Sequence, residues 1–194
     1  MFHQESAKLA DMQYAAALKE RFEPTIILMA GGTASGKSEY VSVYLQNSSA
    51  IVLVGTLPTF HGAKIKITKA FKAKKLVEVH CVLPKSLMVA FVVFLNRDRK
   101  FATEHFFRTH SSARKTLLEV AQAFPDVKIK IIISDVDYVD FGAGGSTMSF
   151  QELFFDTQTA LIEFLRSAQY NEDSIKEAVF RSYDTQEPPQ TIQP

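Results

Sequence analysis

The chain has 194 residues, which is the length of one α/β domain with additions at its edge. Its 22 basic and 21 acidic residues give a formal net charge of +1, which argues against a general polyanion-binding protein. The single cysteine, Cys81, excludes an intrachain disulfide framework and fits a reducing compartment. Because Cys81 stands in an apolar run, we expect it to be a small buried residue.

The first half of the chain alternates predicted helices with short apolar strands. Pro24 ends the first helix, and Gly55 ends the second strand. The helix rich in lysine has Ile65, Ala70 and Phe71 available for the core. In chain order, we expect helices over residues 4–21, 37–45 and 62–75, and strands over residues 25–30, 51–54 and 76–83.

The second half is expected to continue in the same way. Pro84 is predicted to open a helix that runs to about Arg99, and Ser111 or Ser112 to cap a helix through Ala121. Later elements are a strand over residues 127–134, a flexible connection over 142–146 and a helix over about 150–169. Residues 184–194 are polar and rich in proline, so we expect a disordered tail after a single domain over residues 1–183.

The N-terminus lacks the continuous apolar segment of a signal peptide. The most apolar stretch, residues 87–95, is too short to cross a bilayer, which needs about 20 residues. We therefore expect a cytoplasmic protein with no membrane association.

A glycine-rich loop follows the strand over residues 25–30 and fills every defined position of G-x-x-x-x-G-K-[ST]. In order, its residues are Gly31, Gly32, Thr33, Ala34, Ser35, Gly36, Lys37 and Ser38. Glycines let the backbone wrap around phosphate, and successive N–H groups can then point at the anion. Lys37 is expected to reach the β- and γ-phosphates, and Ser38 to offer its hydroxyl to Mg²⁺. The alternative is a glycine turn in which Lys37 is merely solvated.

The position of this loop between a strand and a helix favours nucleotide binding. Alternating strands and helices further predict a P-loop NTPase-like three-layer α/β/α sandwich with a mostly parallel sheet. The chain has no Asn-Lys-x-Asp signature and no Asp-x-x-Gly after the second strand, so ATP is preferred over GTP. Kinases, GTPases and motor ATPases share the loop, which therefore leaves the reaction open.

Beyond the loop, residues 25–135 resemble the zeta toxin family of P-loop kinases. The matching features are the loop, Gly55-Thr56-Leu57 after a strand, the helix–strand pair at residues 72–79, Pro84, and the arginines of residues 96–99 and 107–109. The resemblance implies an ATP-dependent kinase that phosphorylates a small-molecule hydroxyl, with UDP-activated amino sugars as the acceptors. It also raises an antitoxin-like protein as a partner.

The resemblance assigns arginines to the γ-phosphate. Arg108 matches one of them and Arg97 the other, with Arg99 as the alternate for Arg97. Arginine suits phosphoryl transfer because it stays charged and offers a planar fork of donors. Arg97, Arg99, Arg108 and Arg114 all fall in one short segment, although a solvated basic patch would show the same cluster.

Two features depart from the family pattern. Family members carry a substrate-contacting acid immediately before Gly-Thr-Leu, where this chain has Val54. They also carry an acidic segment whose aspartate acts as general base, whereas residues 45–50 here contain no carboxylate. A whole strand–helix unit is missing. Since a hydroxyl nucleophile needs an oriented acceptor for its proton, the step from binding to transfer is weakened.

The remaining carboxylates near expected strand ends could assist Mg²⁺ or act as a base. Asp135 and Asp137 follow the fourth strand, at the carboxyl edge where such sheets bind ligands. Loop acids facing water are the simpler interpretation of both. The other candidates are Glu39, which we expect on a helix surface, Asp98 and Glu104.

Neither a nucleic-acid partner nor a zinc site is expected. The lysines over residues 64–75 fit the wet face of an amphipathic helix and lack interleaved aromatic residues. The histidines do not have metal-site spacing with Cys81. Three hypotheses remain: a zeta-toxin-like phosphotransferase, a catalytically weakened nucleotide-binding module that acts through a partner, and a simple ATPase.

Overall fold

A computed structural model describes residues 2–97, 101–140, 145–168 and 171–184. The helices are α1 (Phe2–Glu20), α2 (Lys37–Tyr40), which continues as a π-helical turn η1 (Val41–Leu45), α3 (Phe60–Lys72), α4 (Leu87–Leu95), α5 (Thr103–Ala123), α6 (Gln158–Ser167) and α7 (Glu172–Asp184). The strands are β1 (Thr25–Ala30), β2 (Ala50–Leu53), β3 (Leu76–Pro84), β4 (Lys128–Asp140) and β5 (Gly145–Leu153).

The strands form one sheet in the order β2-β1-β3-β4-β5. The first four are parallel, and β5 runs antiparallel to β4. Strand β1 lies between β2 and β3, where Ile26 pairs with Ile51 on one side and with Val77 on the other. Parallel strands buried on both faces read as continuous apolar runs, which explains the Ile- and Val-rich composition of β1 and β2. The predicted P-loop NTPase-like α/β/α architecture with a mostly parallel sheet is confirmed.

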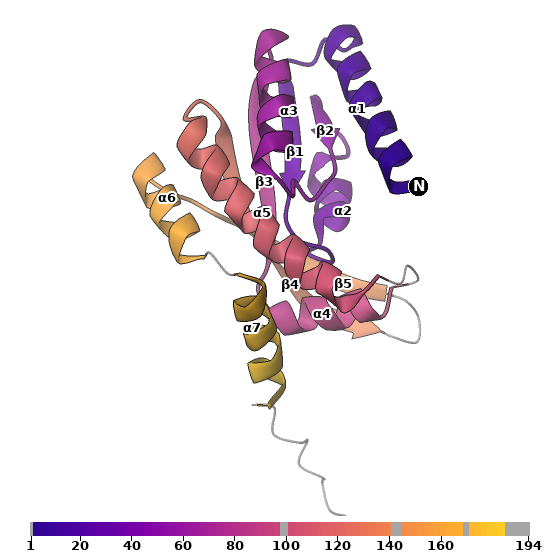
Figure 1. Cartoon of the computed structure of the whole chain (residues 1–194), viewed down its shortest axis with the longest axis vertical. Coiled ribbons are helices and arrows are strands. Elements are labelled where there is room, and N and C mark those ends of the chain that lie inside the picture. Colours follow the sequence, from indigo (N-terminus) through magenta and orange to yellow (C-terminus); the bar gives the residue numbers. More distant parts are fainter. Residues whose placement is uncertain (1, 98–100, 141–144, 169–170, 185–194) are drawn as a thin grey trace, which may run out of the picture.

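Helices cover the two faces of the sheet unequally. Figure 1 shows α3 and α5 crossing the sheet, with α1 along the β2 side. The main core under these helices includes Ile26, Leu28, Ile67, Leu117 and Ile131. The opposite face is covered near β1 by α2 and η1, where a second cluster joins Ile27, Met29 and Tyr40 to Val82 and Ile132.

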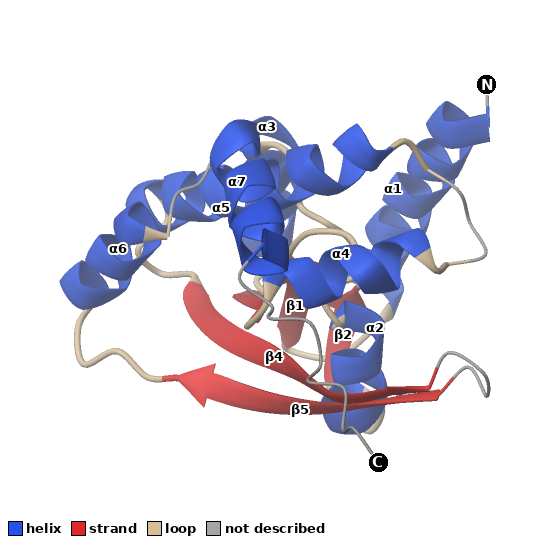
Figure 2. Cartoon of the chain, turned by 90° about the horizontal axis from the view of Figure 1, so that it is seen from below, coloured by secondary structure: helices blue, strands red, loops and turns tan. Residues whose placement is uncertain are grey.

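A third apolar cluster lies beside the phosphate loop. It joins α4, the first turns of α5 and α7 through Phe94, Phe106, Phe107 and Val179, and it includes Ala34 of the loop. In Figure 2, α4 and α7 lie together on the same side of the sheet as α5, while β4 and β5 curve away as a long pair. This cluster connects the loop directly to the helices that follow β3.

The predicted helix over residues 150–169 is wrong at its start. Residues 145–153 form β5, in which Met148, Phe150 and Glu152 are partly buried while Thr147, Ser149 and Gln151 are exposed. This alternation has the period of two that a strand requires. Helix α6 begins only after Thr157, whose hydroxyl accepts a hydrogen bond from the Ala160 N–H at 3.1 Å. In the sequence, apolar residues continue from this strand through Phe155 to Leu161, so no clear boundary separates the strand from the helix.

Two other helix starts also differ from expectation. Pro84 ends β3 instead of opening a helix, and α4 is capped by Ser86, whose hydroxyl accepts from the Val89 N–H at 3.2 Å. Helix α4 ends at Leu95, and Arg99 lies outside the described residues. Helix α5 begins at Thr103, well before the expected cap at Ser111 or Ser112, because Phe106 and His110 continue its buried face.

The remaining expectations are settled in part. The N-terminal helix, predicted over residues 4–21, is present as α1. The flexible connection over 142–146 falls partly on residues 141–144, which lie outside the described chain, and residues 145 and 146 belong to β5. Residues 185–194 of the expected tail are also outside it. Helix α7 was not predicted.

Candidate functional site

The loop at residues 31–38 connects the carboxyl end of β1 to α2. Its backbone is left-handed at three positions, with φ values of 128° at Gly31, 60° at Ala34 and 85° at Gly36. A Cβ atom on Gly31 would lie 2.3 Å from the Val82 carbonyl oxygen, and one on Gly36 would lie 2.7 Å from Met148 Cε. Both glycines are therefore required by backbone conformation and by close neighbours.

Lys37 folds back over this loop. Its ammonium group donates hydrogen bonds to the carbonyl oxygen of Gly31 at 3.0 Å, to the carbonyl oxygen of Gly32, and to Ser35 Oγ at 3.2 Å. Burial, with a smaller contribution from the nearby Arg97 guanidinium, lowers the pKa of Lys37 to about 8. A partly buried cation held by three neutral oxygens can gain strongly from an anionic partner.

The backbone of the loop offers donors for that partner. Within the described chain, the N–H groups of residues 36–38 have no hydrogen-bond acceptor, whereas the Thr33 N–H donates to Thr109 Oγ1 at 3.1 Å. Successive unpaired N–H groups beside a buried ammonium form a nest for an anion. The residues present therefore fit a phosphate group, and the Ser38 hydroxyl, which is exposed at the start of α2, fits a magnesium ligand.

Side chains distant in sequence hold the loop in place. On α5, Thr109 contacts Thr33 through both hydroxyls at 3.0 Å, and His110 Nε2 donates to the Thr33 carbonyl oxygen at 2.9 Å. From β4, the buried Ser134 hydroxyl donates to the Ser35 carbonyl oxygen at 2.8 Å. Hydrogen bonds from α5 and from β4 thus hold the loop in place without a bound ligand.

His110 is a buried neutral imidazole. Burial and the neighbouring Arg114 guanidinium lower its pKa to about 3. Arg114 Nη1 lies 3.4 Å from His110 Nδ1 and donates to the His110 carbonyl oxygen at 3.1 Å. With Nδ1 facing a donor that is always charged, the ring proton is on Nε2, where it reaches Thr33.

A hollow of about 240 Å³ opens over the loop. One wall comes from the loop itself and from Ser38 and Glu39, and another from Gly55 and Thr56 after β2. The third comes from the segment after α4, which contributes Arg97 and Phe101, and from the first turn of α5, which contributes His105. The structure therefore brings Arg97 and Lys37 to the same hollow.

The other arginines of the predicted cluster lie elsewhere. Arg108 is exposed on α5, with Nη2 3.4 Å from His105 Nδ1, and it does not line the hollow directly. Arg114 is buried against His110, where it supports the loop. Arg99 is not among the described residues.

Among the described residues that line this hollow, Glu39 is the one carboxylate. It is exposed, as expected for a helix surface, yet it borders the phosphate site. Asp135 is bound to Lys85 in an ion pair, and Glu104 accepts a hydrogen bond from Thr103 at 3.3 Å. Asp98 and the side chain of Asp137 lie outside the described part of the structure.

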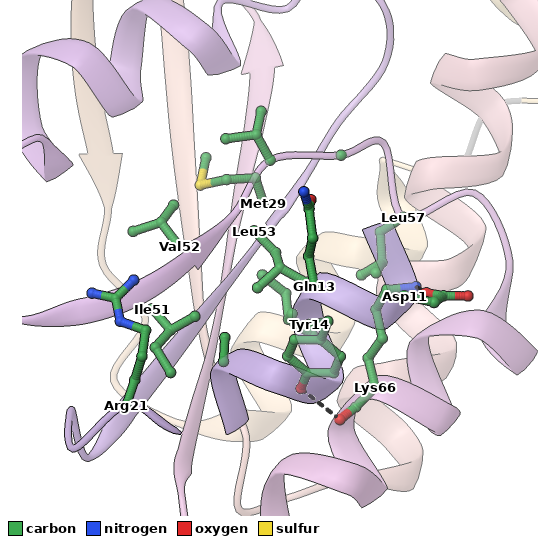
Figure 3. Close-up of a pocket in the computed structure, with 14 residues that line it drawn as sticks. Asp11, Gln13, Tyr14, Arg21, Met29, Ile51, Val52, Leu53, Leu57 and Lys66 are labelled. Carbon is green, nitrogen blue, oxygen red and sulfur yellow. Dashed lines mark hydrogen bonds and ion pairs between the residues drawn. The ribbon is translucent and has the colours of Figure 1, made fainter. Parts of the chain in front are cut away.

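A larger groove of about 520 Å³ lies on the other side of Gly55, along the open edge of β2. Figure 3 shows Tyr14 and Asp11 of α1 facing Leu57 and Lys66, with Arg21 beside Ile51. The Tyr14 hydroxyl donates to the Lys66 carbonyl oxygen at 2.9 Å, and the Lys66 ammonium lies 3.4 Å from Asp11. Val54 lines this groove with 55% of its surface exposed.

Sequence reasoning missed the residues that support the loop. Thr109, His110 and Ser134 carry no motif, and their role depends on the pairing of β3 with β4 and on where α5 passes the loop. Only the position of His110 one turn before Arg114 gave a local signal. In the described residues, no helix combines the length and the apolar character that a membrane span needs.

No protein-family model and no curated protein matches the chain. Among solved structures, it is similar to the AvrRxo1-ORF1:AvrRxo1-ORF2 complex crystallised with sulphate ions, at 14% identity and a TM-score of 0.49 over 86% of this chain and 71% of that chain. The native form of the complex scores 0.47 at 11% identity, covering 91% and 81% of the two chains. The form with ATP scores 0.46 at 14% identity, covering 85% and 72%.

Proposed function

We propose that the chain is an ATP-binding, zeta-toxin-like P-loop phosphotransferase that transfers the γ-phosphate to a small-molecule hydroxyl. The observation that carries the proposal is the arrangement of the loop. The partly buried Lys37 ammonium belongs to a loop whose N–H groups at residues 36–38 have no acceptor in the described chain, and Arg97 lines the same hollow. Such a site concentrates positive charge where a triphosphate carries its negative charge.

Each residue has a defined role in this proposal. Lys37 and the loop N–H groups hold the phosphates, while the Ser38 hydroxyl would hold Mg²⁺, which supplies further charge neutralisation when bound. Arg97 neutralises charge that develops on the transferred group. The family resemblance gives Arg108 the same task, and from its exposed position on α5 it would have to reach past His105.

The acceptor would enter beside Gly55, which borders both the phosphate hollow and the groove along β2. UDP-activated amino sugars are the acceptors that the resemblance implies. Among the described residues that line this groove, Asp11 is the one carboxylate, and it forms an ion pair with Lys66. A general base for the acceptor hydroxyl would therefore come from Asp11 or from Glu39.

A second candidate function is nucleotide binding without transfer, through which the chain would act on a protein partner such as an antitoxin-like protein. Val54 is the observation that favours it, because an exposed apolar side chain stands where the family has a substrate-contacting acid. A simple ATPase, with water as the acceptor, is the third alternative.

One assay separates these functions. Purified protein is incubated with γ-labelled ATP and Mg²⁺, with and without UDP-amino sugars and nucleosides. A labelled small molecule supports the phosphotransferase, free phosphate alone supports the ATPase, and binding without turnover supports the nucleotide-binding module. Lys37→Ala serves as the inactive control. A parent protein that binds no ATP would contradict all three.

A further inference from the structure

A second hollow, of about 390 Å³, borders the phosphate loop on the side away from Gly55. It is lined by Ser38, Glu39, Ser42, Val43, Met148 and Phe150. Ser38 and Glu39 also line the phosphate hollow, so the two spaces meet at the start of α2. Because β2 and β5 are the opposite edges of the sheet, the phosphate hollow opens toward Gly55 and this second hollow toward β5.

The two hollows differ in chemistry. The phosphate hollow carries Lys37, Arg97 and the loop N–H groups, whereas the second hollow has Val43, Met148 and Phe150 as apolar walls. Its polar groups are the Ser38 and Ser42 hydroxyls and the exposed Glu39 carboxylate. A polar end and an apolar end that meet at Ser38 match a molecule with charge at one end and a flat ring at the other.

The apolar wall is fixed in position. The Phe150 ring packs edge-to-face on Tyr40, with centroids 5.5 Å apart, and on Tyr44 at 5.9 Å. Met148 lies directly against the loop, because a Cβ atom on Gly36 would fall 2.7 Å from Met148 Cε. Aromatic pairs of this geometry hold a ring rigidly, which lowers the cost of stacking a ligand on it.

From this arrangement we infer that the hollow between α2 and β5 is the nucleobase site. The inference rests on the proposed nucleotide binding and adds the orientation of the nucleotide: phosphates toward Gly55 and Arg97, base against Met148 and Phe150. A base that stacks on an aromatic side chain contributes about 1–3 kcal/mol, which corresponds to roughly 5- to 150-fold in affinity. Base recognition here uses the flat face of the ring, supported by Met148.

The test compares two ligands by titration calorimetry: ATP, and inorganic tripolyphosphate, which has the same charged chain but no base. The parent protein should bind ATP more tightly than tripolyphosphate. Met148→Ala and Phe150→Ala should each weaken the binding of ATP about tenfold. The affinity of each variant for tripolyphosphate should stay within about twofold of the parent's. Phe154→Ala is the matched control, because Phe154 follows β5 with 85% of its surface exposed and lines neither hollow.

The outcomes distinguish this inference from the proposed function. Equal affinities of the parent for ATP and tripolyphosphate, or variants that weaken both ligands equally, would overturn the base site alone. A parent that binds neither ligand would overturn nucleotide binding and the base site together.

A fluorescence measurement covers the case in which Phe150→Ala does not fold. The chain has no tryptophan, so Phe150→Trp creates a single reporter in the hollow. ATP should quench or shift its emission and tripolyphosphate should not, since only ATP brings a ring against the indole. The same ligands should leave Phe154→Trp unchanged. Identical responses of both reporters to ATP would contradict the assignment.

Discussion

The His110 imidazole donates from Nε2 to the carbonyl oxygen of Thr33 at 2.9 Å, across 77 positions of sequence. The contact joins the middle of α5 to the phosphate loop, and Arg114 fixes the ring from its other side. Since Arg97 and Phe101 come from the segment that leads into α5 and His105 from its first turn, α5 positions both the loop and the wall opposite it. The loop geometry therefore depends on residues that no phosphate-binding motif contains.

The first prediction concerns acid sensitivity. The pKa of His110 is lowered to about 3 in the folded chain, below its ordinary value of 6.5. Between these values the unfolded chain binds the proton and the folded chain does not, so stability falls as pH drops from 6.5 toward 3. His110→Gln keeps an N–H donor for Thr33 but cannot titrate.

Urea unfolding at about pH 7.5 and about pH 5 measures this effect. The free energy of unfolding of the parent relative to His110→Gln should decrease at the lower pH. If the free energies of unfolding of the two proteins changed equally with pH, His110 would not be a buried neutral group.

The second prediction concerns Gly32, which packs on the same histidine. A Cβ atom there would lie 2.2 Å from the His110 ring, which is closer than any relaxed contact. Gly32→Ala should therefore cost about 1–3 kcal/mol of stability and displace the loop. Thermal unfolding and ATP titration check both effects.

Gly55→Ala is the control for stability. A Cβ atom on Gly55 would have nothing within 4 Å, so its melting temperature should stay near that of the parent. Equal melting temperatures for Gly32→Ala and Gly55→Ala would contradict the close contact with His110.

The third prediction concerns the charge of Lys37. Its pKa is lowered to about 8 in the folded chain from its ordinary value of 10.5, so the buried charged form carries a cost below pH 8. Between pH 8 and 10.5 the unfolded chain holds more protons, and stability gains as pH rises. Relative to Lys37→Met, the parent should therefore become more stable as the pH is raised from about 7.5 to about 10.

Denaturant unfolding of both proteins at these two pH values tests the sign. Tripolyphosphate should abolish this pH dependence of the stability difference between the two proteins, because an anion beside the ammonium keeps it charged. A difference that is independent of pH without ligand would mean that Lys37 is solvated.

The fourth prediction separates the two arginines. Arg97 lines the phosphate hollow, whereas Arg108 is exposed beside His105. Under the proposed function, Arg97→Ala should lower the rate of phosphate transfer or release by about tenfold or more, with a smaller change in ATP affinity. Arg108→Ala should have a smaller effect on the rate.

Single-turnover kinetics with γ-labelled ATP measures both variants, and Arg181→Ala on α7, which does not line the hollow, is the control. If Arg108→Ala abolished turnover while Arg97→Ala did not, Arg108 would be the arginine that contacts the γ-phosphate.

Local patterns predicted the half of the site that is continuous in sequence. The apolar run of β1, the two glycines and Lys37 are adjacent, so their spacing alone predicts a strand, a loop and a helix start. Arg97 could be predicted because it follows the helix after β3, at the carboxyl edge of the sheet.

The rest depends on tertiary pairing that short-range patterns do not contain. Strand β5 was missed because its alternation spans few residues and continues into an apolar segment that resembles a helix start. With β5 predicted as a helix, the wall formed by Met148 and Phe150 could not be foreseen. The roles of Ser134 and His110 likewise appear only once β4 and α5 are placed beside the loop.

The most direct test of phosphate binding at residues 31–38 is the affinity of the chain for Mg²⁺-ATP with and without the loop lysine. Isothermal titration calorimetry compares the parent, Lys37→Ala and the control Lys72→Ala, which removes a lysine from the end of α3. Hydrogen bonds to a charged group contribute about 1.5–3 kcal/mol, so Lys37→Ala should weaken binding roughly 10- to 150-fold, and Lys72→Ala should match the parent. Equal binding of ATP by Lys37→Ala and the parent would contradict the assignment of residues 31–38 as the phosphate site.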